Sequence, residues 1–376
     1  MANDHERYAP GQVRDAIIRV MRLSSEALSA KQVAERVAKV EGHMPESSIR
    51  SYLRLNTPSM FVRERRGIYR LKDDYDSSLQ RTILGNTELE TPYRIGNATL
   101  VHGDCLDWLD AREDSSIHAI VTDPPYGLQE YSRKEQSKLR TRKGGVWRIP
   151  PSFDGNVRSP LPRFTTLTDG QKLYLREFFF IWTRLLLPKL VPGANVVVAS
   201  NPLLSHIVAG AIADAGLERR GEIVRLVMTM RGGDRPKAAH DEFEGVSVLP
   251  RSMWEPWLLF RRPIEGRVQD NLRKWRTGGF RRPNSFKPFG DVIRSSPTRK
   301  NERAIAPHPS LKPQAFMRML VRGVLPLGEG VVVDTFAGAG STLAAAEAVG
   351  YESVGIEKDS LYFKVAKEAV QSLSEL

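Results

Sequence analysis

Four consecutive residues, Asp123, Pro124, Pro125 and Tyr126, follow the apolar run at 117–121, which predicts a buried strand. The amine of a nucleobase is a poor nucleophile because its lone pair is delocalised into the ring. A carboxylate at 123 and a backbone carbonyl held rigidly by two prolines can accept its two N–H groups and favour a tetrahedral nitrogen. The next aromatic side chain can stack on a base drawn out of its helix. The alternative is a proline-rich turn in which Asp123 accepts hydrogen bonds from turn amides.

A second segment, residues 331–342, predicts a buried strand, a glycine loop and the start of a helix. Gly338 and Gly340 would let a ligand approach backbone amides at the helix N-terminus. The dinucleotide fingerprint needs a third glycine where this chain has Leu343, which disfavours a nicotinamide or flavin cofactor. Glu357 ends the following strand, a position suited to binding ribose hydroxyls. A tight strand–helix turn is the alternative for the glycine pair alone.

Together with two further elements, these segments resemble a known family. The elements occur in the order Gly103-Asp104, Asp123 to Tyr126, His308 to Pro313 and Phe336 to Gly340. In this order they resemble the beta class of amino-group DNA methyltransferases, which use S-adenosylmethionine. The resemblance covers about residues 93–376. It implies an α/β, Rossmann-like methyltransferase fold, with a mostly parallel seven-stranded sheet flanked by helices.

The resemblance also implies roles for individual residues. Asp123 and the Pro124 carbonyl would hold the target amine, with Pro125 stiffening the segment, and Tyr126 would stack on the flipped base. The cofactor implied is S-adenosylmethionine, and no metal is implied. The residues expected around the cofactor are Asp104, Lys312, Asp334, Phe336, Gly338, Gly340, Thr342 and Glu357.

Two further residues close to these motifs in the sequence are expected to have other roles. His308 is expected to have a structural role, and Cys105 to face the core behind Asp104. Methylation of cytosine at C5 requires a cysteine nucleophile, normally after a proline, and Cys105 does not fit that pattern.

The expected target is the N6 amine of adenine, because cytosine-N4 enzymes of this family more often carry Ser where this chain has Asp123. Cytosine N4 stays open as the alternative. A catalytically inactive DNA-binding regulator on the same scaffold is the rival from another class, against which the intact motif residues argue. Methylation of RNA or of a protein glutamine is a third reading. The glutamine enzymes favour Asn at this position.

The basic residues are concentrated in three segments of the 376-residue chain, whose net charge is +12. Residues 1–75 carry +4, residues 131–163 carry +7 and residues 261–304 carry +9, which leaves −8 on the other 224 residues. This distribution predicts contact with a polyanion. Residues 128–163, which include the second segment, would form a loop over the substrate, and residues 262–306 would form the target-recognition region. The residues expected to contact DNA are Arg63, Arg65, Arg66, Arg273, Lys274, Arg276, Arg281 and Arg282.

The N-terminal residues 1–75 predict a domain of three helices followed by a hairpin with a basic tip about Gly67. The pattern resembles a winged helix that binds DNA, and a small helical dimerisation domain is the alternative. Residues 76–92 read as a linker and 93–376 as the methyltransferase domain, in which strands alternate with helices. The strands expected there are 98–102, 117–121, 195–199, 222–230, 254–260, 331–334 and 353–356.

The cysteine count and the lengths of the apolar runs indicate the cellular compartment. A single cysteine excludes a disulfide framework, and the sequence shows neither a signal peptide nor an apolar run long enough to cross a bilayer. We therefore expect a cytoplasmic protein without a membrane partner. Double-stranded DNA is the expected partner, while a cognate restriction endonuclease and a homodimer stay open.

Overall fold

The computed structural model divides the chain into two compact units, residues 1–85 and 86–376, each described here by itself. The described residues are 12–22, 24, 26–41, 44–57, 61–71, 91–125, 167, 169–227, 236, 239, 241–308 and 310–376.

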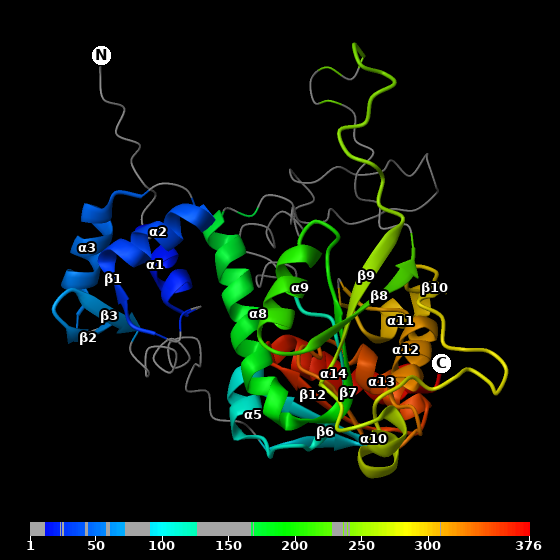
Figure 1. Cartoon of the computed structure of the whole chain (residues 1–376). Coiled ribbons are helices and arrows are strands. Elements are labelled where there is room, and N and C mark those ends of the chain that lie inside the picture. Colours follow the sequence, from blue (N-terminus) through cyan, green and yellow to red (C-terminus); the bar gives the residue numbers. More distant parts are fainter. Residues whose placement is uncertain are drawn as a thin grey trace. The chain divides into compact units, whose positions relative to one another are not determined.

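The N-terminal unit contains three helices and a small antiparallel sheet (Figure 1). The helices are α1 (Gln12–Arg22), α2 (Ala30–Glu41) and α3 (Glu46–Leu55), and the strands are β1 (Leu28–Ser29), β2 (Phe61–Arg65) and β3 (Ile68–Leu71) in the order β1-β3-β2. Ser29 and Gln32 exchange side chain–backbone hydrogen bonds of 2.8 and 3.2 Å and so form a capping box at the start of α2. The predicted three helices and hairpin are present, and β1 is an addition to them.

The second unit is built on a nine-stranded mixed sheet. Its strands are β4 (Tyr93–Ile95), β5 (Ala98–His102), β6 (Ile117–Thr122), β7 (Leu190–Ala199), β8 (Glu218–Leu226), β9 (Trp254–Arg261), β10 (Val292–Arg294), β11 (Val331–Asp334) and β12 (Glu352–Glu357). Their spatial order is β10-β8-β9-β7-β6-β11-β12-β5-β4, with five parallel pairings and three antiparallel ones. The predicted mostly parallel α/β fold is confirmed. The sheet exceeds the expected seven strands because the three-residue strands β4 and β10 add one to each edge.

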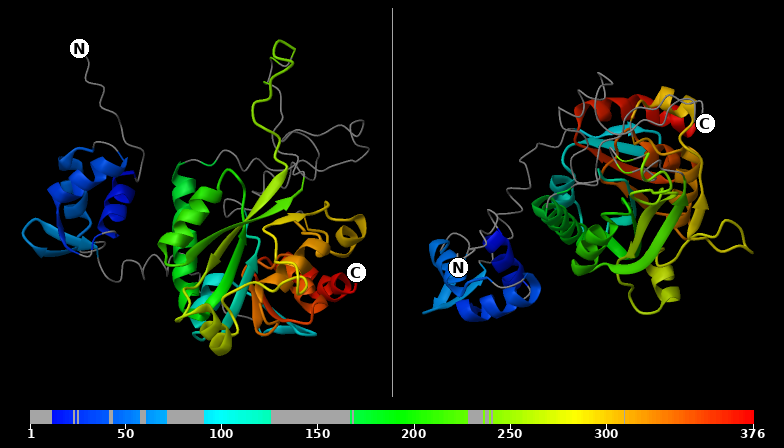
Figure 2. Two further views of the ribbon diagram at one scale, coloured as in Figure 1. Left: turned by 45° about the vertical axis from the view of Figure 1, so that its right-hand side comes forward. Right: turned by 90° about the horizontal axis from the view of Figure 1, so that it is seen from above.

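Helices cover both faces of this sheet (Figure 2). Helices α12 (Gln314–Val324), α13 (Ser341–Ala348) and α14 (Ser360–Ser374) pack in sequence against one face. Helices α5 (Cys105–Ala111), α8 (Asp169–Lys189) and α9 (Ser205–Asp214) pack together against the other. Two shorter helices are α10 (Val268–Trp275) and α11 (Lys300–Ile305). Among the described residues, no helix combines the length and apolar character needed to span a membrane.

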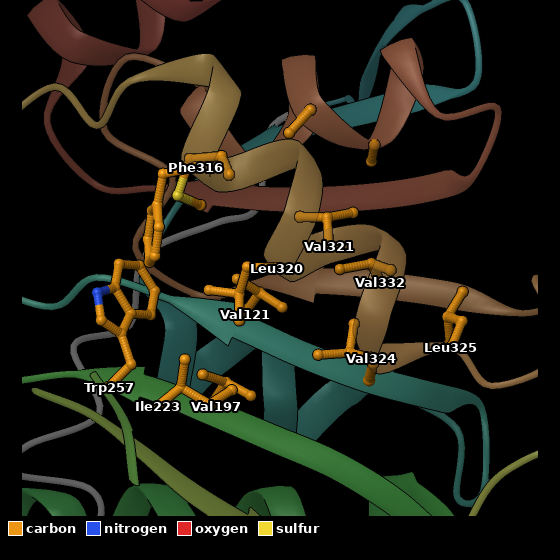
Figure 3. Close-up of a cluster of buried hydrophobic side chains, with 14 of the residues drawn as sticks. Val121, Val197, Ile223, Trp257, Phe316, Leu320, Val321, Val324, Leu325 and Val332 are labelled. Atoms are coloured by element: carbon orange, nitrogen blue, oxygen red, sulfur yellow. The ribbon is translucent and has the colours of Figure 1, made fainter. Parts of the chain in front are cut away.

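An extensive apolar contact between helix and sheet lies under α12 (Figure 3). The rings of Trp257 from β9 and Phe316 from α12 lie 5.3 Å apart between centroids, and both are almost wholly buried. Leu320 and Val324 continue the same helix face over Val121 and Val197. Burying each such side chain contributes about 1.5–3 kcal/mol, so this cluster holds α12 firmly on the central strands.

Some element boundaries differ from the sequence expectation. Strand β7 begins at Leu190 rather than 195, and β8 covers Glu218–Leu226 rather than 222–230. The shift of β8 follows from its pairing with β9, which keeps the polar residues at 218–222 within the ladder. Residues 262–306, which were expected to lack regular structure, contain α10, β10 and α11.

The carboxyl ends of β5, β12, β11 and β6 meet at one edge of the sheet, which we call the carboxyl edge. The chain leaves β6 toward β7 on one side, whereas β11 leads to β12 on the other. Such a reversal of strand order opens a crevice beyond the strand ends, where ligands bind in open α/β sheets.

Candidate active site

Asp123, Pro124 and Pro125 follow directly on β6 at the carboxyl edge. Pro124 is buried and Pro125 is half-buried, so the backbone of this segment is fixed against the core. The Asp123 side chain is 18% exposed. Tyr126, the fourth residue of the motif, lies outside the described residues, as does the basic segment 131–163.

Asp123 is paired with Lys312 from the His-Pro element that precedes α12. Lys312 Nζ lies 2.5 Å from Asp123 Oδ2 and 3.0 Å from Glu255 Oε1, and Arg225 Nη1 donates to Glu255 Oε2 at 2.7 Å. The four buried side chains thus form a chain of alternating charge. Removing one partner from a buried ion pair typically costs about 3–5 kcal/mol, because the other charge is left uncompensated.

The pKa values of this network reflect burial and the neighbouring charges. Burial raises the pKa of Asp123, and the Lys312 ammonium opposes that shift. Burial also disfavours the charged form of Glu255, but Lys312 and Arg225 outweigh it and lower the Glu255 pKa. For Lys312, burial acts toward a lower pKa, and the carboxylates of Asp123 and Glu255 raise it above its usual range.

Asp334 ends β11 next to this network and joins β11 to β6. Thr122 Oγ1 donates to Asp334 Oδ1 at 2.6 Å, and the Phe336 amide donates to the same oxygen at 3.0 Å. Burial raises the Asp334 pKa to about 6, against the hydrogen bonds from Thr122 and Thr342. Thr342 is itself buried and lies 3.4 Å from the Val121 carbonyl of β6. Sequence segments more than 200 residues apart therefore meet here.

Glu357 at the end of β12 holds the glycine loop. Its Oε2 accepts a 2.7 Å hydrogen bond from the Gly338 amide and its Oε1 one of 2.7 Å from the Asp359 amide. Burial raises the Glu357 pKa to about 7, although both amides favour the ionised form. A partly buried carboxylate at this strand end is suited to accept hydrogen bonds from sugar hydroxyls.

Glycine is needed at the two positions of the loop for different structural reasons. Gly338 has φ +52°, and a Cβ there would lie 3.4 Å from His308 Nε2, so a side chain would fill the space between the loop and His308. Gly340 has φ +83°, and a Cβ would lie 2.4 Å from Val370 Cγ2 of α14. Gly338 therefore keeps a cradle open, whereas Gly340 lets the last helix dock against the loop.

His308 lies next to the Gly338 cradle, and Cys105 lies in the core at the start of α5. The His308 ring packs against Tyr362 at 4.3 Å between centroids, and its Nδ1 accepts from the Ser310 amide at 3.1 Å. Burial, with help from Lys312, lowers the His308 pKa to about 4, so the ring is neutral at pH 7. Cys105 is buried at the start of α5, where burial raises its pKa well above the usual range.

Asp104 caps α5 and faces the sheet edge. Its Oδ1 accepts from the Leu106 amide at 2.8 Å, and Lys358 Nζ lies 2.7 Å from Oδ2. Asp104, Glu357, Asp334 and Asp123 thus stand at the ends of four adjacent strands, in the order β5, β12, β11 and β6.

These residues fit the expected cofactor. S-adenosylmethionine is a sulfonium cation with an ammonium group and ribose hydroxyls, so it needs hydrogen-bond acceptors and negative charge. The four carboxylates supply both, and the Gly338 cradle offers close access to backbone. Phe336 borders the cradle, with its ring centroid 6.1 Å from that of Phe178. Within the described residues, no group of three or more His, Cys, Asp or Glu is arranged to hold a metal ion.

The structure does not bring all predicted DNA contacts to this site. Arg273, Lys274 and Arg276 lie on or just after α10, which contacts the start of β7, and Arg276 pairs with Glu329 just before β11. Arg281 donates to the Tyr351 hydroxyl, one residue before β12. These residues therefore lie at the amino edge of the sheet, opposite Asp123. Arg282 is exposed, and its backbone carbonyl accepts from Arg322 at the end of α12.

Another set of basic residues lies at the carboxyl edge. Exposed Arg294 ends β10, and exposed Arg299, Lys300 and Arg303 lie at α11. This segment is joined to the His-Pro element, because Thr298 Oγ1 donates to the Leu311 carbonyl at 2.5 Å and the Gln314 amide donates to buried Glu302 at 2.7 Å. We call residues 294–303 the α11 segment. Arg63, Arg65 and Arg66 of the N-terminal unit are exposed at the end of β2 and in the following turn.

Sequence reasoning missed Glu255 and Arg225. Glu255 is a charged residue inside β9, whose other members are largely apolar, and that irregularity was an available signal. Arg225 lies in β8 among several other charged residues, so the sequence offered no comparable signal for it. Lys312 was expected beside the cofactor, and the structure pairs it with Asp123. The pairing could not be read from the sequence, since 189 residues separate the two.

The site can now be compared with known proteins. The model of a DNA methylase family, N6_N4_Mtase, matches residues 248–368, which include Glu255, Lys312 and Glu357. The chain is 23% identical over 296 residues to Type II methyltransferase M.HindIII of Haemophilus influenzae, covering 71% of this chain and 93% of that protein. It is 23% identical over 295 residues to Type II methyltransferase M2.DpnII of Streptococcus pneumoniae, covering 77% and 96%.

Two solved structures are also similar. The PvuII DNA methyltransferase, described as cytosine-N4-specific, has 14% identity and a TM-score of 0.48, and the match covers 76% of this chain and 94% of that one. The M1.HpyAVI complex with S-adenosylmethionine has 16% identity and a TM-score of 0.45, covering 73% and 99%.

Proposed function

We propose that this chain, an S-adenosylmethionine-dependent DNA methyltransferase of the N6/N4 amino type, methylates the N6 amine of adenine in double-stranded DNA. The observation that carries the proposal is the carboxylate of Asp123, held by Lys312 at the end of β6 beside the acceptor-rich cradle. Cytosine-N4 enzymes of this family more often carry Ser at that position, which supports adenine.

The residues of the site would act chiefly by positioning. Asp123 would accept one N–H of the target amine, the Pro124 carbonyl the other, and Tyr126 would stack on the flipped base. When bound, S-adenosylmethionine supplies an electrophilic methyl group. The nitrogen would gain that methyl group as the methyl carbon–sulfur bond breaks, and the proton that it loses would pass along the hydrogen bond to Asp123. Glu357, Asp104 and Asp334 would hold the ribose, adenine and methionine parts of the cofactor.

Two separate surfaces are proposed to contact DNA, one on each unit. The first is the α11 segment. The second consists of Arg63, Arg65 and Arg66 of the N-terminal unit, which would act as a winged helix. Exposed guanidinium and ammonium groups at the carboxyl edge are placed to contact phosphates on either side of a base inserted toward Asp123. We place the enzyme in the cytoplasm, with a cognate restriction endonuclease as a further proposed partner.

The test is transfer of a labelled methyl group to double-stranded DNA, followed by digestion to nucleosides and mass spectrometry. N6-methyladenine is the expected product, and N4-methylcytosine would replace the proposal by its alternative. Long-read sequencing of DNA from cells with and without the gene would give the target sequence. Bound cofactor without transfer to any DNA would favour the inactive regulator.

A further inference from the structure

Two buried charges that the proposed reaction has not used, Glu255 and Arg225, lie directly behind Lys312. They face each other in register on the adjacent strands β9 and β8. We propose that Glu255, held by Arg225, is a positioning residue that fixes the Lys312 ammonium against Asp123, so that the carboxylate meets the target amine charged and in one orientation. The inference rests on the proposed role of Asp123.

The distances show that Lys312 is shared between two carboxylates. Its Nζ lies 2.5 Å from Asp123 Oδ2 and 3.0 Å from Glu255 Oε1. The other oxygen of Glu255 accepts from Arg225 at 2.7 Å. Both oxygens of Glu255 are thus engaged, and its position follows from two cations that are themselves buried.

Arg225 is anchored independently of Lys312. Its Nε donates to Ser295 Oγ at 3.0 Å, its Nη2 lies 3.3 Å from the Ser296 carbonyl, and its guanidinium lies 5.2 Å from the Phe316 ring centroid. A planar guanidinium with three fixed directions of contact is a rigid support for a carboxylate. The same contacts tie the network to the start of the α11 segment.

The balance of charge explains why a second carboxylate is useful. An ammonium paired with Asp123 alone would donate only to that carboxylate, and it would compete with the target amine for the carboxylate oxygens. Sharing the ammonium with Glu255 leaves Asp123 more negative, and a carboxylate can accept from Lys312 and from an amine at once. The charged groups that face Asp123 are Lys312, Glu255 and Arg225, together with Asp334 across β11.

Substitutions in this network should shift the pH dependence of methyl transfer in opposite directions. The measurement is the single-turnover rate on DNA with saturating cofactor across the acid range. Lys312→Met removes a positive charge and should move the acid limb of the pH–rate profile to higher pH, because the Asp123 pKa rises. Glu255→Gln removes a negative charge and should move it to lower pH, while the plateau rate falls about tenfold because the ammonium loses its second anchor.

The chain offers a matched control on the same two strands. Arg261 and Glu218 form a 2.7 Å ion pair at the other end of β9 and β8, at the amino edge. Glu218→Gln should change the plateau by less than about twofold and leave the acid limb in place. The double variant Glu255→Gln with Lys312→Met should match Lys312→Met within about twofold, because Glu255 acts through Lys312.

The outcomes separate this inference from the proposed function. A wild-type enzyme that transfers methyl groups, with a Glu255→Gln variant of unchanged plateau and acid limb, overturns the inference alone. A wild-type enzyme that transfers none overturns both. If circular dichroism shows that Lys312→Met has not folded, the comparison of Glu255→Gln with Glu218→Gln decides.

Discussion

Lys312 Nζ donates a hydrogen bond of 2.5 Å to Asp123 Oδ2 at the carboxyl edge of the sheet, although 189 residues separate the two in the chain. The contact joins the end of β6 to the His-Pro element, which itself follows the α11 segment. The α11 segment is therefore joined to Asp123 within the second unit, through Leu311 and Lys312.

Asp123→Ala should abolish methyl transfer while the cofactor affinity changes by less than about tenfold, or ~1.4 kcal/mol. The reason is that Asp123 is proposed to hold the amine, whereas Glu357 and Asp104 hold the cofactor. Transfer of labelled methyl groups and calorimetric titration of S-adenosylmethionine measure the two quantities. Asp110→Ala, at an exposed position of α5, is the matched control. Retained transfer in Asp123→Ala would refute the assignment.

Glu357→Gln should weaken cofactor binding by at least about tenfold, ~1.4 kcal/mol, because a neutral amide is a weaker acceptor for ribose hydroxyls. In the wild type, affinity should rise with pH through about 7, where Glu357 ionises. Calorimetry at several pH values measures both effects. An affinity that is independent of pH in the wild type, or equal in the variant, would contradict the ribose role.

The raised pKa of Glu357 also determines the direction in which the free energy of unfolding changes with pH. The folded protein holds this proton up to about pH 7, whereas the unfolded chain releases it near the ordinary value of 4.5. The stabilising contribution is therefore complete below the unfolded pKa and is lost as pH rises through about 7. Urea unfolding without cofactor, from pH 5 to 8, should show a smaller pH dependence in Glu357→Gln than in the wild type. An equal slope would show that Glu357 ionises normally.

Replacing Arg294, Arg299 and Lys300 by Gln should weaken DNA binding and reduce its salt dependence. Each phosphate contact contributes about 0.9 to the slope of log K against log salt, so the triple variant should lose up to about 2.7. The control is the same change at Arg273, Lys274 and Arg276, which lie at the amino edge and should leave the slope unchanged. The reverse result would move the DNA surface to α10.

Replacing Arg63, Arg65 and Arg66 by Gln in the full chain should weaken DNA binding and lower its salt dependence without changing the methylated sequence. Exposed arginines at a hairpin tip are suited to phosphate contact, which positions a protein but carries no sequence information. Binding titrations at several salt concentrations and sequencing of modified DNA check the two parts. An altered target motif would show that the N-terminal unit reads bases, and deletion of residues 1–75 is the stronger form of the test.

Much of the fold could be predicted because the central strands are uninterrupted apolar runs. Strands β5 and β11 occur at the predicted residues, since Val- and Leu-rich segments buried on both faces leave little choice of state. Helix α10 could not be predicted in the same way. Its sequence is mostly polar, and it is held by one buried side chain, Asn271, which donates to the carbonyls of Pro192 and Thr277.

The site was predictable to the extent that it is local in sequence. Asp123, Asp334 and Glu357 each follow or end a predicted strand, and parallel strands bring such positions to one edge. The pairing of Lys312 with Asp123 depends on how the segment between β9 and α12 returns to the sheet. Glu255 depends on the register of β9 against β8, because a slip of one residue would turn it to the other face.

Gly340 links the cofactor loop to the last helix of the chain. Val370 and Ala366 of α14 pack where a Cβ at Gly340 would be, so the loop takes its shape against residues near the C-terminus. A side chain at position 340 would therefore displace α14, so a Gly340→Ala change should disturb the glycine loop and the packing of this helix together.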